Sequence, residues 1–283
     1  MARILKIDQI APAFKRYLIE EPVVANRHKA GQFVIVLLSD LGERIPLTIA
    51  ASDALRGTIT LVVQEVGKTT MEMGRLRPGD ALRVVGPLGR PTHIEKLGTC
   101  VCIGGGCGIA PLLPIARANR DAGNHVVSIL GGRTDELVIL RPEMEVVSEE
   151  VYYITDDGSL GAKGLVTDAL ERYIEISGSP AQVVAIGPAV MMRAVSELTR
   201  PLGIPTVVSL NTIMIDGTGM CGGCRVPVGG ESKFVCVDGP EFDGHQVDYD
   251  MLIKRQRIYL EQEEIARRRF LEKHECRAAA MGG

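Results

Sequence analysis

Hydrophobic residues in the first third of the chain come in short runs that are rich in β-branched side chains. Four such runs lie at residues 3–12, 32–39, 57–66 and 80–89, separated by Gly, Pro, Asp and Asn. Runs of this length between turn-forming residues are typical of β-strands. Helical periodicity is confined here to residues 69–76. The pattern predicts a small antiparallel barrel over residues 1–98.

The pattern changes at Thr99, where apolar strands begin to alternate with helical segments. Strands are expected at 99–103, 125–130, 151–154, 181–186 and 205–210, with helices at 112–122, 142–149, 165–174 and 188–200. Such alternation predicts a doubly wound parallel sheet over residues 99–210. Regular alternation stops after Leu210. Residues 211–283 are expected to form a small C-terminal segment that ends in a charged helix.

Composition narrows the range of functions. A length of 283 residues fits two or three domains of ~100–200 residues each. The net charge is −3 and no basic block is present, which argues against a nucleic-acid partner. No apolar run approaches the ~18 residues of a membrane span, and the first residues lack the apolar core of a signal peptide. We therefore expect a cytoplasmic protein without a membrane partner.

Three of the seven cysteines are clustered, which fits metal ligation in a reducing compartment better than disulfides. Two residues separate Cys221 from Cys224, and eleven more precede Cys236. Plant-type [2Fe–2S] sites follow the pattern C-x4-C-x2-C…C, and Asp216 occupies its first position here. Four glycines between the ligands let the backbone wrap tightly. The pattern predicts a [2Fe–2S] cluster on Asp216, Cys221, Cys224 and Cys236.

Two other interpretations of this segment stay open at the level of sequence. Structural zinc could be held by the three cysteines and His245, because sites with three cysteines and one histidine are common. Alternatively, the thiols are reduced and bind no metal. The four-residue interval after Asp216 and the glycine-rich wrapping favour the iron–sulfur cluster over both.

A glycine-rich loop follows the first strand of the α/β region and opens its first helix. Its glycines are Gly104, Gly105, Gly106 and Gly108. In a doubly wound fold, this place binds a dinucleotide pyrophosphate on backbone amides and a helix N-terminus. The spacing departs from the strict G-x-G-x-x-G fingerprint, so the evidence comes from the strand-loop-helix context.

Two further loops follow later strands and should face the same crevice, because ligands bind at the carboxyl ends of parallel strands. Arg133 and Asp135 follow the second strand. The acidic residue suits the ribose hydroxyls of NAD and the arginine suits the extra phosphate of NADP, so the choice stays open. The other loop contains Gly187, Pro188, Met191 and Met192.

Two loops of the β-rich region could bind an anion. Arg44 can pair bidentately with a phosphate, and Thr48 offers a hydroxyl nearby on the same strand. Residues 67–70 (Gly67, Lys68, Thr69 and Thr70) form a glycine turn before a short helix, where backbone amides can hold an anion. Each pattern is also common as ordinary protein surface.

Taken together, these motifs resemble the ferredoxin-NADP reductase superfamily, in the branch of dihydroorotate dehydrogenase electron-transfer subunits. The strongest likeness is to the small (alpha) subunits of NADH-dependent reduced ferredoxin:NADP oxidoreductases, also described as sulfide dehydrogenase beta subunits. Residues 211–250, including Asp216, carry the most specific part of it, and it extends over essentially the whole chain.

The resemblance implies a fold and a set of cofactors. Residues 1–98 would form an FAD-binding barrel, with Arg44, Pro46, Leu47 and Thr48 along the flavin. In this reading, Arg44 holds a phosphate and Thr48 lies near the reacting ring. Residues 67–70 would supply a second FAD contact. The glycine loop would cradle NAD(H), residues 187–192 would border the nicotinamide, and the C-terminal segment would hold the cluster.

The resemblance also implies an activity. NAD(H) exchanges a hydride with FAD, and the [2Fe–2S] cluster exchanges single electrons with a larger flavin and iron–sulfur subunit in a heterodimer. Ferredoxin is then an indirect partner, and electrons are bifurcated. Three alternatives remain: an electron-transfer subunit of dihydroorotate dehydrogenase, a sulfide dehydrogenase activity, and a zinc-stapled nucleotide-binding regulator that is not an enzyme. A cysteine is usual at the first ligand position of dihydroorotate dehydrogenase subunits, so Asp216 argues against the first.

Overall fold

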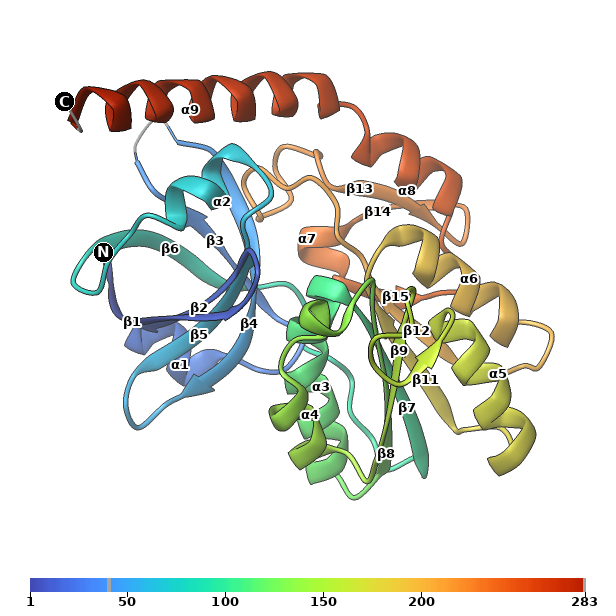
Figure 1. The fold of residues 1–283 in the computed structure, drawn as a ribbon. Helices are drawn as coiled ribbons and strands as arrows, with labels where there is room; N and C mark the ends of the chain where they lie inside the picture. Colours follow the sequence, from blue (N-terminus) through green and yellow to red (C-terminus); the bar gives the residue numbers. More distant parts are fainter. Residues whose placement is uncertain (40–41, 282–283) are drawn as a thin grey trace.

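The computed structural model describes residues 1–39 and 42–281, with side chains as far as Glu272. The N-terminal region is a closed antiparallel barrel with strand order β1-β2-β5-β4-β3-β6 (Figure 1). Its elements are β1 (Ala2–Ala11), β2 (Phe14–Glu20), α1 (Pro22–Arg27), β3 (Phe33–Leu37), β4 (Arg44–Asp53), β5 (Thr58–Gln64), α2 (Lys68–Met73) and β6 (Ala81–Leu88). The predicted barrel is confirmed.

The barrel closes over its own apolar core, where side chains from all six strands meet. The sequence pattern missed β2, because charged Lys15 and Arg16 interrupt its apolar alternation. Tyr17 of this strand is nevertheless fully buried, and its hydroxyl donates to the Met73 carbonyl at 3.0 Å. Burial of alternate residues, more than their average hydropathy, defines this strand.

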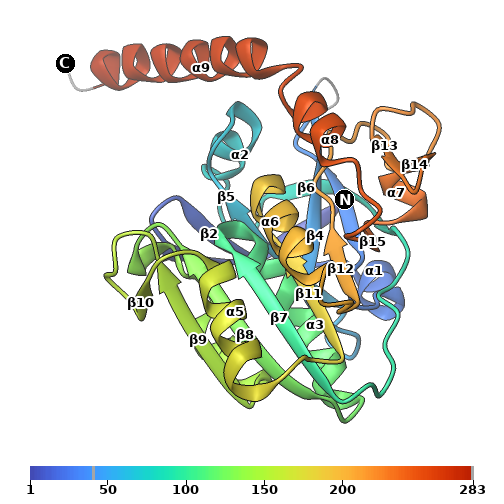
Figure 2. The same cartoon turned by 90° about the vertical axis from the view of Figure 1, so that its right-hand side faces the viewer.

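The region that follows the barrel contains a seven-stranded sheet with order β10-β9-β8-β7-β11-β12-β15 (Figure 2). Its strands are β7 (Thr99–Gly105), β8 (His125–Gly132), β9 (Glu150–Thr155), β10 (Ala162–Lys163), β11 (Gln182–Ile186), β12 (Thr206–Ser209) and β15 (Glu241–Asp243). All pair in parallel except β15, which runs antiparallel to β12. The parallel sheet predicted from the alternating pattern is confirmed.

Helices cover both faces of this sheet. They are α3 (Ile109–Asp121), α4 (Arg141–Val147), α5 (Val166–Ser177) and α6 (Ala189–Thr199). Side chains of α3 and α4 pack in one core with Cys100 and Cys102, whereas α5 and α6 pack on the opposite face. The two cysteine sulfurs point the same way and lie 3.9 Å apart in the core. They serve packing, as their alternation predicts.

The C-terminal segment is attached to both other regions. It contains the hairpin β13 (Arg225–Val228) and β14 (Glu231–Phe234), followed by α7 (Val235–Asp238), β15, α8 (Tyr249–Gln256) and α9 (Leu260–Met281). Strand β15 extends the nucleotide-binding sheet, and the sequence pattern missed it because three residues with two acids show no apolar period. Helix α9 runs over the barrel beside α2, where the Arg75 guanidinium lies 4.4 Å from the Phe270 ring (Figure 1).

Candidate functional site

The glycine-rich loop after β7 lies directly against the loop that follows β11. A Cβ atom on Gly105 would come within 2.4 Å of the Met191 sulfur, and one on Gly108 within 2.2 Å of the Ile186 carbonyl oxygen. The contact at Gly108 is with backbone, so this position requires glycine, whereas a side chain at Gly105 would displace the Met191 side chain. The structure therefore brings the two loops into contact at the carboxyl ends of neighbouring strands, where open α/β sheets bind their ligands.

The first turn of α3 is available to an anion. Its N-cap is Gly108, and no side chain caps the helix start. The backbone of Gly106 has a φ of +55°, and a Cβ there would meet open space. Burial raises the pKa of the Cys107 thiol in this loop to about 11. The thiol is therefore neutral, and an anion bound at this loop would be held by backbone amides.

In the loop after β8, Asp135 pairs with a residue other than Arg133. Asp135 pairs with Arg141 at 2.7 Å, and its backbone N–H donates to the Ser159 hydroxyl at 2.8 Å. Arg133 is exposed and has no ion pair within the described residues. The structure thus gives Asp135 a partner of its own and leaves the Arg133 side chain accessible at the edge of the crevice.

In the barrel, the two predicted anion-binding loops are adjacent. The Thr69 hydroxyl, buried at the start of α2, donates to the carboxylate of Glu43, the residue before Arg44. The Thr70 hydroxyl accepts from the backbone N–H groups of Val66 and Gly67, at 3.1 and 3.0 Å. Some amides of this turn are therefore occupied by the protein itself.

Two basic side chains beside these barrel loops are available to a ligand. Neither Arg44 at the start of β4 nor Lys68 at the start of α2 pairs with a carboxylate within residues 1–39 and 42–272. Further along β4, Pro46 and Leu47 are half-buried, and Thr48 lies opposite Phe33 of β3. Strand β4 therefore has an exposed arginine at its start and the Thr48 hydroxyl four residues later. This arrangement suits an elongated ligand with a phosphate at one end.

Two of the three clustered cysteines converge. Cys224 and Cys236 are buried, and their sulfurs lie 3.2 Å apart. Burial, helped by the neighbouring thiol, raises the pKa of Cys236 to about 12. Two thiol sulfurs at this distance are a pair of soft ligands, and thiols bind a metal in their deprotonated form.

The other two predicted ligands lie on the exposed part of the same loop. The Asp216 carboxylate accepts from the backbone N–H groups of Thr218 and Cys221, at 2.8 and 2.7 Å, and these bonds lower its pKa. The Cys221 sulfur accepts from the Gly223 N–H at 3.4 Å. Across the described residues, no three His, Cys, Asp or Glu side chains are grouped as metal ligands. The structure thus gathers two ligands and places the other two next to each other.

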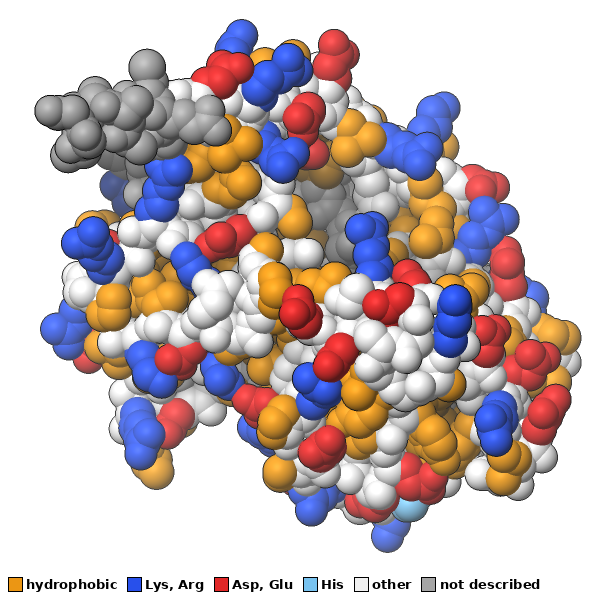
Figure 3. Space-filling model, in the orientation of Figure 1, with side chains coloured by type: hydrophobic (Ala, Val, Ile, Leu, Met, Phe, Trp, Pro, Cys, Tyr) orange, Lys and Arg blue, Asp and Glu red, His pale blue; other side chains and the backbone are white. Residues whose placement is uncertain are grey.

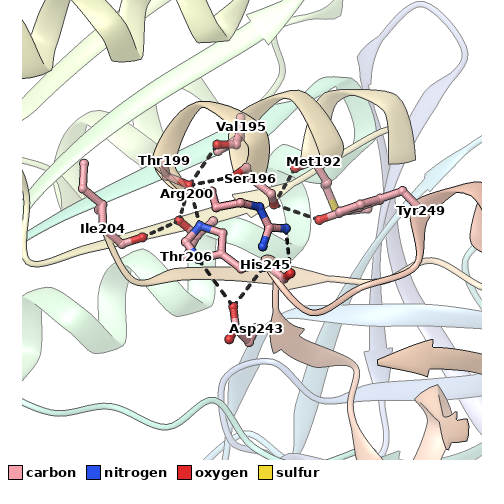
Figure 4. A network of polar contacts seen from close by, with 10 residues as sticks. All are labelled: Met192, Val195, Ser196, Thr199, Arg200, Ile204, Thr206, Asp243, His245 and Tyr249. Atoms are coloured by element: carbon pink, nitrogen blue, oxygen red, sulfur yellow. Dashed lines mark hydrogen bonds and ion pairs between the residues drawn. The ribbon is translucent and has the colours of Figure 1, made fainter. Parts of the chain in front are cut away.

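His245 takes no part in this group, so the zinc interpretation loses its fourth ligand. Its Nε2 lies 2.9 Å from the Thr199 hydroxyl of α6, and its backbone carbonyl accepts from Arg200 at 2.6 Å (Figure 4). Thr206 donates to the same Thr199 hydroxyl at 2.6 Å. His245 is therefore a structural residue that fixes the chain after β15 to α6.

The same network contains two residues that no sequence pattern predicts. Ser196 and Tyr249 are buried, and their hydroxyl oxygens lie 2.9 Å apart (Figure 4). Ser196 also donates to the Met192 carbonyl at 2.8 Å. Isolated hydroxyls on a helix carry no pattern, so only the fold reveals this link between the methionine loop and the C-terminal segment.

On the face of the molecule that Figure 3 shows, acidic and basic side chains are interspersed with hydrophobic ones.

An antiparallel barrel, a parallel nucleotide-binding sheet and a cysteine-rich segment together define a ferredoxin reductase-like oxidoreductase subunit. Two family models agree. Residues 102–197 match the oxidoreductase NAD-binding domain, and residues 211–248 match the iron-sulfur cluster binding domain of dihydroorotate dehydrogenase B. These domains and the fold support FAD, NAD(H) and a [2Fe–2S] cluster as the cofactors.

Relatives of known sequence place the chain in a family. A dihydroorotate dehydrogenase B (NAD(+)) electron transfer subunit homolog from Thermotoga maritima is 47% identical over 275 residues, 95% of each chain. The electron transfer subunit from Desulforamulus reducens is 30% identical over 88% of this chain and 98% of its own length. The protein belongs to the family of dihydroorotate dehydrogenase B electron transfer subunits, which confirms the resemblance drawn from its motifs.

Solved structures agree with this assignment. A chain of NADH-dependent reduced ferredoxin-NADP oxidoreductase, studied for flavin-based electron bifurcation, superposes with a TM-score of 0.90 at 44% identity, covering 96% of this chain and 98% of that one. The cytochrome b5 reductase domain of Ulva prolifera nitrate reductase has a TM-score of 0.59 at 20% identity over 71% of this chain and 92% of its own, which shows the fold alone. Of the helices described here, none has both the length and the apolar character to cross a membrane.

Proposed function

We propose that the protein is the electron-transfer subunit of a flavin-based, electron-bifurcating oxidoreductase in the cytoplasm. It moves a hydride between NAD(H) and FAD, and single electrons between FAD and a larger flavin and iron–sulfur subunit through a [2Fe–2S] cluster. The observation that carries this proposal is the attachment of the cysteine segment to both other regions. A Cβ on Gly217 would meet Leu88 and Ile35 of the barrel at 2.7 and 2.9 Å, while β15 joins the nucleotide-binding sheet.

The barrel residues fit FAD. Arg44 and Lys68 are cations without carboxylate partners in the described part, on loops joined by the bond from Thr69 to Glu43. We assign the diphosphate of FAD to these cations and the free amides of residues 67–70. Pro46, Leu47 and Thr48 then follow the flavin inward along β4. When bound, FAD supplies the exchange between a two-electron hydride and two single electrons.

The crevice between the β7 and β11 loops fits the nicotinamide dinucleotide. We assign the pyrophosphate to the amides of Gly104, Gly105, Gly106 and Gly108 and to the start of α3. Gly187, Pro188 and Met191 then form one wall for the nicotinamide, whereas Met192, predicted to border it, is fully buried in the core. Arg133 and Asp135 border the adenosine end. Hydride transfer needs no acid or base from the protein, so these residues bind, orient and exclude water.

The donor set in the C-terminal segment fits a [2Fe–2S] cluster. Cys224 and Cys236 already converge, and Cys221 and Asp216 lie on a loop whose glycines 217, 219 and 222 adopt positive φ values of 77°, 84° and 65°. Such a backbone can wrap a small inorganic core without side-chain clashes. The cluster supplies a one-electron carrier. Cys221 is the exposed thiol of the three, so this side of the loop faces the partner.

Removal of a phosphate-binding cation tests the flavin site. We expect Arg44→Leu to lose most of its FAD during gel filtration while its iron content stays unchanged. Arg27→Leu, an exposed arginine at the end of α1, is the matched control and should keep both. If Arg44→Leu retained full FAD with unchanged affinity, the proposed phosphate contact would be wrong.

A second candidate partner follows from the names of the relatives. The Thermotoga and Desulforamulus proteins are described as electron transfer subunits of dihydroorotate dehydrogenase B. Affinity purification of this chain from its native cells, with identification of the bound partner, separates the two candidates. We expect a larger subunit with flavin and additional iron–sulfur clusters that reduces ferredoxin. Recovery of a subunit that oxidises dihydroorotate would favour the other function.

A further inference from the structure

Helix α8 holds the cysteine loop at both ends. The Arg255 Nη2 donates to the Gly223 carbonyl at 2.9 Å. The neighbouring Gln256 side-chain amide donates to the backbone carbonyl and the side-chain oxygen of Asn211, at 2.7 and 2.8 Å. Asn211 begins the loop and Gly223 comes directly before Cys224. The last turn of α8 therefore contacts both ends of residues 211–223, the stretch that contains Asp216 and Cys221.

Helix α8 is itself fixed to the nucleotide-binding region. Its N-cap Asp248 accepts from the Met251 N–H at 2.9 Å, and Leu252 is 1% exposed. Tyr249, in its first turn, meets Ser196 of α6 inside the buried network (Figure 4). Arg255 thus acts from a rigid element, which is the condition for a precise contact to the loop.

The contact falls between two predicted ligands. Gly223 separates Cys221 from Cys224, and its N–H donates to the Cys221 sulfur at 3.4 Å. Its carbonyl belongs to the peptide that leads into Cys224, and this is the carbonyl that Arg255 holds. The guanidinium therefore orients the peptide group that leads into Cys224, and the residue it contacts lies two positions after Cys221.

The charge of Arg255 has no carboxylate partner among residues 1–39 and 42–272. The side chain is half-buried and lines a surface cavity together with apolar Ile215, Leu252, Ile258 and Tyr259. Partly buried charges are screened less by water and salt than exposed ones. An unpaired cation on the peptide that leads into Cys224 is positioned to act on the negative charge of a cluster held by this loop.

We propose that Arg255 is a positioning residue that raises the reduction potential of the cluster and fixes its loop, an inference that rests on the proposed cluster. Reduction adds one negative charge to the cluster, and a nearby cation stabilises that added charge. Net charge and hydrogen bonding around the sulfurs are the main means by which proteins set such potentials. Arg255 therefore favours the reduced cluster.

A redox titration of the full-length, anaerobically purified protein, followed by EPR of the reduced cluster, tests this role. We expect Arg255→Gln to keep its iron and lower the midpoint potential by the equivalent of a ~10-fold change in the reduction equilibrium, about 59 mV for one electron. Arg255→Lys keeps the charge and should stay near the native potential. Lys254→Gln removes an exposed charge from the same helix and should change nothing.

Iron and sulfide are quantified in every sample. Loss of iron in Arg255→Gln with native iron and potential in Arg255→Lys also supports the inference. Native potentials in both Arg255 variants, equal shifts in both, or loss of iron from both would overturn it. Absence of iron from the native protein would instead contradict the proposed function itself, so the two failures are distinguishable.

Discussion

Gly108 of the nucleotide loop and Gly222 of the cysteine loop are glycines for different reasons. In the nucleotide loop, Gly108 has an ordinary helical φ of −63°, but a Cβ would strike the Ile186 carbonyl at 2.2 Å. In the cysteine loop, Gly222 has a φ of +65°, and an added Cβ would lie 3.5 Å from the Phe234 ring, an ordinary van der Waals distance. Gly108 has no space for a side chain, whereas Gly222 adopts a backbone conformation that residues with a side chain rarely reach.

This difference matches what each loop has to bind. A dinucleotide needs a rigid groove, and the contacts between neighbouring strand ends supply one. A cluster forms covalent bonds to its ligands, so its loop needs only the right backbone path and a few fixed points. Asp216 and Arg255 are two such points, through their bonds to loop backbone groups. Binding of the cluster should therefore complete the order of the second loop.

The largest effect should come from a buried ligand of the cysteine loop. Cys224→Ser replaces a soft thiolate by a hard hydroxyl, and we expect complete loss of iron with FAD retained. Iron and acid-labile sulfide analysis of the purified variant measures this. Cys107→Ser in the nucleotide loop is the control and should keep full iron. Native iron in Cys224→Ser would remove this residue from the ligand set.

In the nucleotide loop, Gly108→Ala should destabilise the protein strongly and weaken NADH binding, because the new methyl group meets backbone rather than a movable side chain. We expect a cost of about 3 kcal/mol or more. Gly106→Ala changes the same loop at an open position with φ +55° and should cost about 1 kcal/mol. Denaturant unfolding measures both. Equal effects would show that backbone conformation, and not space, governs this loop.

A smaller, pH-dependent effect on stability should arise at Glu241 on β15, the strand that joins the C-terminal segment to the parallel sheet. Burial raises the pKa of its carboxyl to about 7, and the Thr92 hydroxyl donates to it at 2.5 Å. The folded protein therefore holds a proton that the unfolded chain loses above its ordinary pKa of 4.5, so stability falls as pH rises from about 4.5 to about 7.

Glu241→Gln removes this dependence while keeping an acceptor for Thr92. We expect the variant to be roughly 2–3 kcal/mol more stable than the native protein at pH 8 and nearly equal to it at pH 4.5. Thermal or denaturant unfolding across this range measures the difference, with exposed Glu261→Gln as control. A constant difference at all pH values would mean that the carboxyl does not titrate in this window.

The mildest change concerns Asp216, the half-buried predicted ligand. Asp216→Cys restores the usual thiolate pattern, so we expect a full cluster with a shifted midpoint potential and an altered EPR signal. Redox titration beside the native protein measures this. Identical potential and EPR signal would show that Asp216 is not a ligand and serves only the backbone bonds to Thr218 and Cys221.

Periodic patterns in the sequence were sufficient for the barrel and the parallel sheet, because both depend on apolar residues at regular intervals. Elements that depend on tertiary pairing were not predicted. Strand β15 carries acids where a strand pattern needs apolar residues, and Tyr17 of β2 follows two charged residues. Among the site residues, glycines and cysteines could be chosen by spacing. The bonds of Arg255, Tyr249 and Glu241 join segments remote in sequence, and no local pattern contains them.

The most direct test of the proposed electron path is an anaerobic visible spectrum of the purified chain before and after addition of NADH, with iron, sulfide and FAD quantified. We predict about two iron, two sulfide and one FAD per chain, and bleaching of both flavin and cluster bands by NADH. A colourless protein that contains zinc in place of iron, and no flavin, would contradict it.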